Sequence, residues 1–356
     1  MKLEDFGYNE RIESLRTGQQ LDVFELGRVI SEHKERYTVL CEKGIFDAEI
    51  TGNLRFSALS REDYPAVGDW VALSIYEPDF SIIHRVIPRY SILSRQEPGA
   101  KGAVQVIAAN VDYALVIQAV DRDFNLNRLE RYLTICHTSR VNPIIVLTKS
   151  DLIGETDKMA LISRIKERIS DVPVLALSNV TGNGLEALIR LIEKGKTYCL
   201  LGSSGVGKST LINSLSGKQL MSTGAISQHS NRGRHVTSFR QLIVLENGGL
   251  LIDNPGMREV GVVDANQGLE TTFDDIVRLA ENCKFSDCTH TTEAGCAVLK
   301  AVETGTIDPA AYENYLKLEK EKTFFETSLL ERKKKDKMFG KTVKDYYKKK
   351  IMGKDL

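Results

Sequence analysis

Short segments in which apolar and polar residues alternate dominate the chain up to about residue 86. Such segments, rich in β-branched residues and separated by turn residues, are typical of strands in a small barrel or sandwich. Five strands are expected, at Leu21 to Ile30, Arg36 to Cys41, Ile45 to Ile50, Trp70 to Tyr76 and Ser81 to Val86. A five-stranded all-β barrel of the oligonucleotide-binding (OB) type is the architecture that this pattern favours.

The rhythm changes after Ser91 to Gly102, which is interpreted as a polar connector. Continuous apolar runs then alternate with amphipathic stretches, the pattern of a doubly wound α/β sheet. The expected strands are Tyr113 to Ala119, Pro143 to Leu147, Val174 to Leu177, Thr197 to Leu201, Phe239 to Leu245 and Leu250 to Ile252, and the expected helices include Leu126 to His137, Lys158 to Ile169 and Leu185 to Glu193. The turn Glu246-Asn247-Gly248-Gly249 predicts one antiparallel pair at the sheet edge.

From about Asp264 onward the chain is rich in Lys and Glu and has a helical pattern, interrupted by a cluster of cysteines. The sequence therefore predicts three domains: a barrel at 1–95, an α/β domain at 96–263 and a mostly helical domain at 264–356. The total length of 356 residues is enough for three compact cores.

The charges balance as a whole, with 48 basic and 48 acidic residues, but not along the chain. Residues 332–356 carry eleven Lys or Arg against three Asp, so this basic tail is +8 and the rest of the chain is −8. No run of about 18 apolar residues exists, and the N-terminus lacks the pattern of a signal peptide. We expect a cytoplasmic protein without a membrane partner. The composition excludes a fully disordered or fibrous chain.

A phosphate-loop pattern follows the expected strand Thr197 to Leu201. In G-x-x-x-x-G-K-[ST], backbone N–H groups surround phosphate oxygens at a helix N-terminus, the lysine reaches the β and γ phosphates, and the hydroxyl ligates Mg²⁺. A chain of this length contains the pattern by chance roughly once in a hundred cases. The residues are Gly202, Ser203, Ser204, Gly205, Val206, Gly207, Lys208, Ser209 and, at the start of the helix, Thr210.

Two further strand ends carry residues suited to a guanine base. Thr148-Lys149-Ser150-Asp151 fits the base-recognition pattern N/T-K-x-D. The Asp151 carboxylate can accept from both N1–H and N2–H of guanine, whereas adenine offers no such pair of donors. Ser178 and Asn179, after the next apolar run, are expected to donate backbone N–H groups to the guanine oxygen. A solvated turn is the alternative for either motif taken alone.

Asp253-Asn254-Pro255-Gly256 fits the switch pattern D-x-x-G, in which Asp253 holds Mg²⁺ through water and the Gly256 amide contacts the γ-phosphate. The four elements stand in an unusual order. Base recognition precedes the phosphate loop, whereas ordinary GTPases begin with the phosphate loop. The sequence thus predicts a circularly permuted domain.

The residue after Gly256 is Met257, where Ras-like enzymes have the glutamine that orients water. His235, in the polar stretch between phosphate loop and switch, is the candidate for that role, and an exposed histidine without a role is the alternative. Thr237 is the expected switch ligand of Mg²⁺, with Thr223 and Ser238 as rivals.

Three cysteines and one histidine crowd into the spacing C-x4-C-x-H-x5-C. Three thiolates and an imidazole are the ligand set of a closed, tetrahedral zinc site, which has no open position for catalysis. The candidate ligands are Cys283, Cys288, His290 and Cys296; the scattered Cys41, Cys136 and Cys199 are expected to be buried thiols.

These motifs together resemble the bacterial small-ribosomal-subunit-dependent GTPases, the circularly permuted RsgA (YjeQ) family. The resemblance also covers Gly233-Arg234-His235 and Asp123-Phe124-Asn125-Leu126, whereas Val236 and Asn254 stand where the family usually has Thr and Ser. It implies GTP hydrolysis stimulated by the small ribosomal subunit, binding to its rRNA, a role in its late maturation, Mg²⁺ with GTP, and one structural zinc.

Other readings stay open. The chain can be a P-loop ATPase of another RNA-related process, or a nucleotide-binding RNA scaffold with little turnover, as Met257 allows. The basic tail, with Phe339, Tyr346 and Tyr347 among its lysines, suits RNA binding, and a solvated charge run is the alternative. We expect a monomer.

Overall fold

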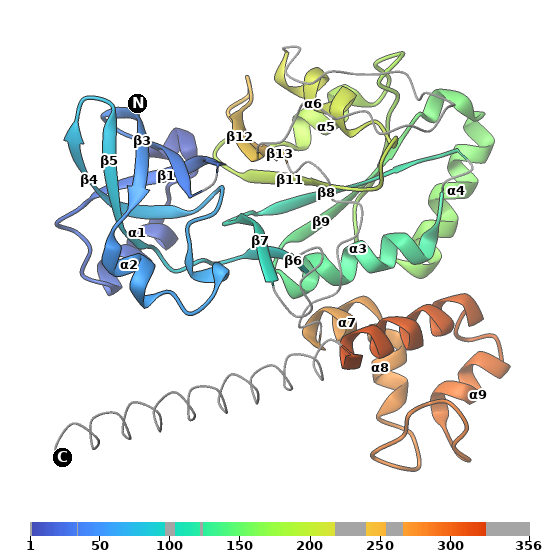
Figure 1. Cartoon of the computed structure of the whole chain (residues 1–356). Coiled ribbons are helices and arrows are strands. Elements are labelled where there is room, and N and C mark those ends of the chain that lie inside the picture. Colours follow the sequence, from blue (N-terminus) through green and yellow to red (C-terminus); the bar gives the residue numbers. More distant parts are fainter. Residues whose placement is uncertain are drawn as a thin grey trace, which may run out of the picture.

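The computed structural model describes residues 2–33, 35–96, 104–121, 124–217, 240–253 and 266–324. Figure 1 shows a barrel in blue, a central sheet flanked by helices in green and yellow, and a group of helices in orange and red below the sheet. Expectations that fall on His235, Thr237, Gly256 and the basic tail therefore lie outside the described residues.

The N-terminal barrel is closed. Its strands follow the order β1-β2-β3-β5-β4, and β4 pairs back to β1, so the ring is complete. Strands β3 and β5 are parallel and the other pairs are antiparallel. The strands are β1 (Glu25–His33), β2 (Arg36–Cys41), β3 (Gly44–Ile50), β4 (Trp70–Glu77) and β5 (Phe80–Val86), with α2 (Gly52–Ser57) and the 3-10 turn η2 (Arg61–Asp63) between β3 and β4. This confirms the predicted five-stranded barrel.

A helix that the sequence pattern did not reveal precedes the barrel. After a 3-10 turn, η1 (Leu3–Phe6), the helix α1 (Glu10–Gly18) begins at Asn9, whose side chain accepts from two backbone N–H groups of the first turn. Within α1 only Ile12 is buried, so the helix has no apolar stripe that periodicity could detect.

The expected polar connector at Ser91 to Gly102 is wrong in part. Strand β6 (Ile92–Gln96) pairs antiparallel with β7 (Val104–Ala109). Leu93 and Ile107 are fully buried against the α/β core. The boundary suggested at residue 95 thus falls inside β6. Polar residues next to Leu93 disguised the strand, because a two-stranded ribbon buries only part of its side chains.

The central sheet confirms the doubly wound α/β prediction. Its strands follow the order β10-β9-β8-β11-β13-β12, and all neighbours are parallel except β12 and β13. Helices α3 and α4 pack on one face and α5 and α6 on the other. The elements are β8 (Tyr113–Ala119), α3 (Leu126–Thr138), β9 (Asn142–Thr148), η3 (Ser150–Leu152), α4 (Glu155–Arg168), β10 (Val174–Ala176), α5 (Leu185–Leu191), β11 (Thr197–Leu201), α6 (Lys208–Ser216), β12 (Arg240–Val244) and β13 (Leu250–Asp253).

The sequence predicted that the antiparallel pair lies at the edge of the sheet. In the structure the pair β12–β13 does not form a free edge. Strand β12 also pairs with β1 of the barrel, with Ser31 opposite Gln241 and Glu32 opposite Arg240. One hydrogen-bonded sheet of eleven strands therefore runs through both domains. Local alternation cannot show this, because it does not specify a strand's partner.

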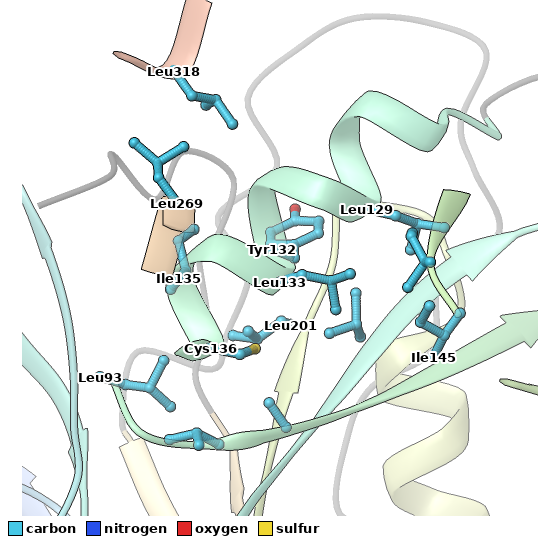
Figure 2. Packing of buried hydrophobic residues seen from close by; sticks show 14 of the residues in the cluster. Leu93, Leu129, Tyr132, Leu133, Ile135, Cys136, Ile145, Leu201, Leu269 and Leu318 are labelled. Atoms are coloured by element: carbon cyan, nitrogen blue, oxygen red, sulfur yellow. The ribbon is translucent and has the colours of Figure 1, made fainter. Parts of the chain in front are cut away.

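The C-terminal part is helical, as predicted, up to the end of the described residues. It contains α7 (Asn266–Thr272), α8 (Asp274–Ala280), α9 (Ala297–Glu303) and a further helix over residues 309–324. Figure 2 shows α3 between two layers: Leu133 and Cys136 face the sheet near Leu201, while Leu269 and Leu318 approach from the C-terminal helices. One apolar cluster thus joins the C-terminal helices to the α/β core.

Cys41, Cys136 and Cys199 are free and buried, as expected of core thiols. Among the described residues, no helix is both long and apolar enough to cross a membrane.

Candidate functional site

The phosphate loop connects β11 to α6 at the carboxyl edge of the sheet. Gly202 packs so closely on β8 that a Cβ atom there would lie 2.5 Å from the Ile117 carbonyl oxygen. Gly207 precedes α6 with φ of +94°, a left-handed conformation that favours glycine. Val206 is buried, whereas Ser204, Gly205 and Ser209 are exposed. The loop is therefore anchored at Val206 and open to solvent along its outer side.

The Lys208 ammonium lies over the loop. Its Nζ donates to the carbonyl oxygens of Gly202 at 2.7 Å and Ser203 at 2.6 Å. Ser209 and Thr210 follow in the first turn of α6, where the helix dipole and the backbone N–H groups favour an anion. This geometry can bind a phosphate chain.

Thr148, expected to contact the base, holds the phosphate loop. The buried Thr148 hydroxyl donates to the Val206 carbonyl oxygen at 2.6 Å. The end of β9 is thereby tied to the middle of the phosphate loop, which fixes the distance between a base site and a phosphate site.

Lys149 and Asp151 follow at the surface. Lys149 has a left-handed backbone with φ of +59°, and its Nζ pairs with Asp121 Oδ2 at 2.7 Å. Ser150 is half-buried and Asp151 is exposed, both in the 3-10 turn η3. The Asp151 carboxylate is thus accessible to a base. Asp121, which the sequence analysis missed, comes two residues after the end of β8, and its place near a strand end was the available signal.

Ser178 and Asn179 lie at the end of β10. The Ser178 backbone N–H already donates to the Asn183 carbonyl at 2.9 Å, and its hydroxyl accepts from Val180 and Thr181 N–H groups. Asn179 Nδ2 donates to the Gly207 carbonyl at 3.4 Å. Of the two amides expected to meet a guanine oxygen, that of Ser178 is therefore engaged within its own turn.

Asp253 ends β13, which is parallel to β11, so its carboxyl group lies at the same sheet edge as the phosphate loop. Burial raises the pKa of Asp253 to about 6, and the nearby Lys208 ammonium opposes this rise. A cation beside the buried carboxylate would favour its charged form. Gly256 and Met257 follow outside the described residues.

Arg128 also reaches the phosphate loop, and the motifs did not include it. Its Nη1 donates to Ser203 Oγ at 3.3 Å. The available signal was the helix cap Asn125, three residues earlier, which places Arg128 in the first turn of α3 at the sheet edge.

The four expected metal ligands lie together in the C-terminal helical part. The ligand atoms of Cys283, Cys288, His290 and Cys296 all lie within 4.8 Å of one another. Cys283 Sγ is 3.8 Å from Cys296 Sγ, and His290 Nδ1 is 3.6 Å and 3.5 Å from these two sulfurs. A tetrahedral zinc with bonds of about 2.3 Å to sulfur requires sulfur pairs about 3.8 Å apart. The side chains present therefore fit one zinc ion with His290 ligating through Nδ1.

Backbone groups support this cluster. The N–H of Ala297 points to Cys283 Sγ at 3.4 Å, and that of Leu299 to Cys296 Sγ at 3.4 Å. The Tyr312 hydroxyl donates to the His290 carbonyl at 2.6 Å. Such donors stabilise negative charge on thiolates and fix the ligand orientation.

Comparison with known proteins gives consistent matches. A family model described as RsgA GTPase matches residues 86–263. A curated relative from Lactiplantibacillus plantarum, named small ribosomal subunit biogenesis GTPase RsgA 2, is 42% identical over 88% of this chain and 89% of its own length. A relative from Bacteroides thetaiotaomicron, named small ribosomal subunit biogenesis GTPase RsgA 1, is 37% identical over 97% of this chain and 96% of its own length.

Two solved structures have a fold similar to that of this chain. YjeQ from Thermotoga maritima aligns with a TM-score of 0.62 at 27% identity, covering 86% of this chain and 98% of that one. YloQ, described as a circularly permuted GTPase, aligns with a TM-score of 0.60 at 26% identity, covering 87% of this chain and 96% of that one.

Proposed function

The chain belongs to the RsgA GTPase family, and we propose from this premise that it binds the small ribosomal subunit and its rRNA, assists late maturation of that subunit, and hydrolyses GTP to GDP and phosphate with stimulation by the subunit. The supporting observation is the Thr148–Val206 hydrogen bond. It joins a base-recognition turn to a phosphate loop at one edge of a parallel sheet, in the permuted order.

GTP would lie along this edge. Lys149 offers its aliphatic stem to the face of the base, and Asp121 holds its ammonium group in place. Asp151 accepts from the guanine N–H donors, and Ser150, Ser178 and Asn179 surround the base. The loop from Gly202 to Thr210 takes the phosphates.

Ser209, Thr237 and Asp253 would hold magnesium, which would supply positive charge that offsets the negative charge of the phosphates. His235 would orient the attacking water and the Gly256 amide would contact the γ-phosphate. Lys208 contributes a positive charge beside the phosphates, because its Nζ already lies over the loop carbonyls.

One structural zinc would be bound by Cys283, Cys288, His290 and Cys296. Four protein ligands close the coordination shell, so the metal would hold the loop before α9 against the rest of the C-terminal domain.

The barrel at 1–95 and the basic tail are the proposed rRNA contacts, with the GTPase domain at 96–263 and the zinc domain at 264–356. We place the protein in the cytoplasm as a monomer without a membrane partner. Because Asp253 to Gly256 leads directly into the zinc domain, γ-phosphate contacts would bias the orientation of that domain. GTP and GDP would then give different affinities for the subunit.

Turnover is the decisive measurement. GTP hydrolysis by the full chain is compared with and without purified small ribosomal subunits, in the wild type and in His235→Ala. We expect strong stimulation in the wild type and its loss in the variant. Absence of stimulation in the wild type would contradict the proposed function, and unchanged stimulation in His235→Ala would contradict the role of His235 alone.

Base choice is tested by competition of GDP and ADP for the site. We expect GDP to bind and ADP to compete poorly. Asp151→Asn should weaken the binding of GDP by about 10- to 100-fold, since a carboxylate that accepts two donors contributes about 1.5–3 kcal/mol. Asp157→Asn, an exposed carboxylate on α4, is the matched control. Equal binding of ADP would favour an ATPase instead.

A further inference from the structure

Arg128 brings a second cation to the phosphate loop. Its Nη1 donates to Ser203 Oγ at 3.3 Å, while Lys208 Nζ donates to the carbonyl oxygen of the same serine at 2.6 Å. Two positively charged side chains, one from α3 and one from α6, therefore converge on the second residue of the loop. The sequence motifs account for Lys208 but assign nothing to Arg128.

The backbone of Arg128 is firmly placed. Asn125 caps α3 and its Oδ1 accepts the Arg128 N–H at 3.1 Å. The N–H and the carbonyl of Asn125 both bind the side-chain amide of Gln118, each at 2.9 Å. Gln118 is buried on β8, which pairs with the phosphate-loop strand β11. The start of α3 is thus fixed relative to the loop.

The charges at this point favour a polyanion. Backbone N–H groups and the N-terminus of α6 already favour an anion at the loop. A phosphate group bound in the loop would add negative charge beside both cations, which favours its binding. A guanidinium group stays protonated, and its planar fork matches two phosphate oxygens. More negative charge gives more stabilisation, so a triphosphate gains more from Arg128 than a diphosphate does.

A positively charged side chain at this place would also favour the hydrolysis of GTP. During phosphoryl transfer, charge is spread over the equatorial and leaving oxygens, and an arginine supplied from the same chain can stabilise it.

We propose that Arg128 contacts the terminal phosphate of bound GTP and stabilises the transition state of its hydrolysis. This rests on the proposed function, since it takes the phosphate loop as the GTP site. Water forms a bond to the γ-phosphorus while the bond between that phosphorus and the β–γ bridging oxygen breaks. The electron pair of the broken bond stays on GDP, and the proton of the water passes to the released phosphate. Arg128 keeps its protons throughout.

The test compares four variants of the full chain: Arg128→Gln, Arg128→Lys, Ser203→Ala and, as control, Arg164→Gln on the exposed side of α4. Three quantities are measured: kcat and KM for GTP in the presence of small ribosomal subunits, and the ratio of dissociation constants for GDP and a non-hydrolysable GTP analogue. Thermal melting verifies that each variant is folded.

We expect Arg128→Gln to lower kcat by at least about tenfold, because arginines acting in this way contribute about 10³–10⁵ in rate. It should also weaken the binding of the GTP analogue more than the binding of GDP. Arg128→Lys should restore part of both effects, since it keeps the charge but not the fork. Ser203→Ala should weaken the binding of both nucleotides to a similar extent. Arg164→Gln should behave as the wild type.

Wild-type kcat and an unchanged GTP-to-GDP ratio in Arg128→Gln would overturn the proposal. So would a Ser203→Ala variant with the same selective loss for the GTP analogue, because Arg128 would then act only through that hydroxyl. If the wild type itself hydrolyses no GTP, the proposed function fails; the affinity ratio still tests the contact with the terminal phosphate.

Discussion

The GTPase domain is joined to its two neighbours by different kinds of contact. The barrel has its own apolar clusters, and it meets the GTPase domain through backbone pairing, a buried polar network and two residues, Val67 and Ile30, that pack in the α/β core cluster. The zinc domain contributes a larger set of apolar residues to the same cluster, which it meets across α3. We name the first contact the barrel joint; it is made by β1, β12 and the hydrogen-bond acceptors of Arg28. We name the second the zinc-domain joint; it is made by α3, α7 and the helix at 309–324.

Arg28 is the centre of the barrel joint. Its guanidinium is buried and donates to the carbonyl oxygens of Phe6, Gly68 and Asn110 and to the Thr197 hydroxyl. Burial lowers its pKa, yet an arginine remains charged. These acceptors belong to the N-terminal turn, the barrel, the β7–β8 turn and the start of β11. Directional bonds to four separate segments fix the angle between the barrel and the GTPase domain.

The zinc-domain joint has close apolar packing with fewer polar ties. A Cβ atom at Gly268 would lie 2.0 Å from Thr138 Oγ1, so α7 lies directly on α3. The buried Glu130 carboxylate forms an ion pair with the Arg168 guanidinium at 2.6 Å. It also accepts a hydrogen bond from the Asn314 side-chain amide at 2.6 Å. Apolar contact is not directional, and packed helices can slide by small amounts. We therefore expect the barrel to move with the GTPase domain and the zinc domain to shift more easily on it.

Removal of the metal should have the largest effect on stability, and this effect should be confined to the zinc domain. Binding of structural zinc supplies on the order of 10 kcal/mol of folding energy. We expect chelation, or Cys288→Ser, to abolish amide protection around α9 while the barrel strands keep theirs, as measured by hydrogen exchange with zinc analysis. Cys41→Ser, a buried thiol of the barrel, should retain one zinc. Equal loss of protection in the barrel would show that the two joints are not independent.

Arg28→Met should destabilise the barrel joint by about 4 kcal/mol, because it leaves several buried acceptors without a donor. Urea unfolding of the full chain measures this. Arg36→Met is the control, since Arg36 is exposed and its pair with Glu49, at 3.9 Å, contributes little. A loss below about 1 kcal/mol would mean that strand pairing alone holds the barrel.

Gly268→Ala should cost about 2 kcal/mol at the zinc-domain joint, because its Cβ forces α7 away from α3. The matched control is Gly154→Ala, where a Cβ would meet nothing within 4 Å. Thermal unfolding and hydrogen exchange of α7 give the readout. Unchanged protection of α7 would show that the joint adapts to the added methyl group.

The smallest effect expected is a pH dependence of the zinc-domain joint. Burial lowers the pKa of His137 from 6.5, and its Nδ1 lies 3.1 Å from Thr272 Oγ1 of α7. A lowered histidine pKa contributes stability above 6.5 that is lost as the pH falls through the folded value. Between pH 7 and 5 we expect the wild type to lose about 1 kcal/mol more than His137→Gln.

The variant comparison isolates the histidine, because Glu130 acts in the opposite direction. Burial raises the pKa of Glu130, although Arg168 opposes the rise, so its contribution is greatest at acid pH and declines as the pH rises. Parallel pH profiles of wild type and His137→Gln would refute the contribution of His137.

Local patterns predicted much of this molecule. Alternation located β2, and apolar runs located β8 and β11 at the observed residues. Ligand spacing located Cys283, Cys288, His290 and Cys296, because the four ligands are close in sequence and need few distant partners. The helix α1 escaped notice because only Ile12 is buried within it.

The sequence by itself determined the barrel, the permuted α/β sheet, the phosphate loop and the cluster of candidate metal ligands, since each depends on residues near one another in the chain. Only the tertiary structure decided which segments meet. Arg28 resembles an ordinary polar strand residue until Phe6, Gly68, Asn110 and Thr197 surround it. Likewise Arg128 acquires a role only when α3 is placed beside Ser203. Pairing between distant segments depends on the closure of the whole fold, and no local pattern encodes it.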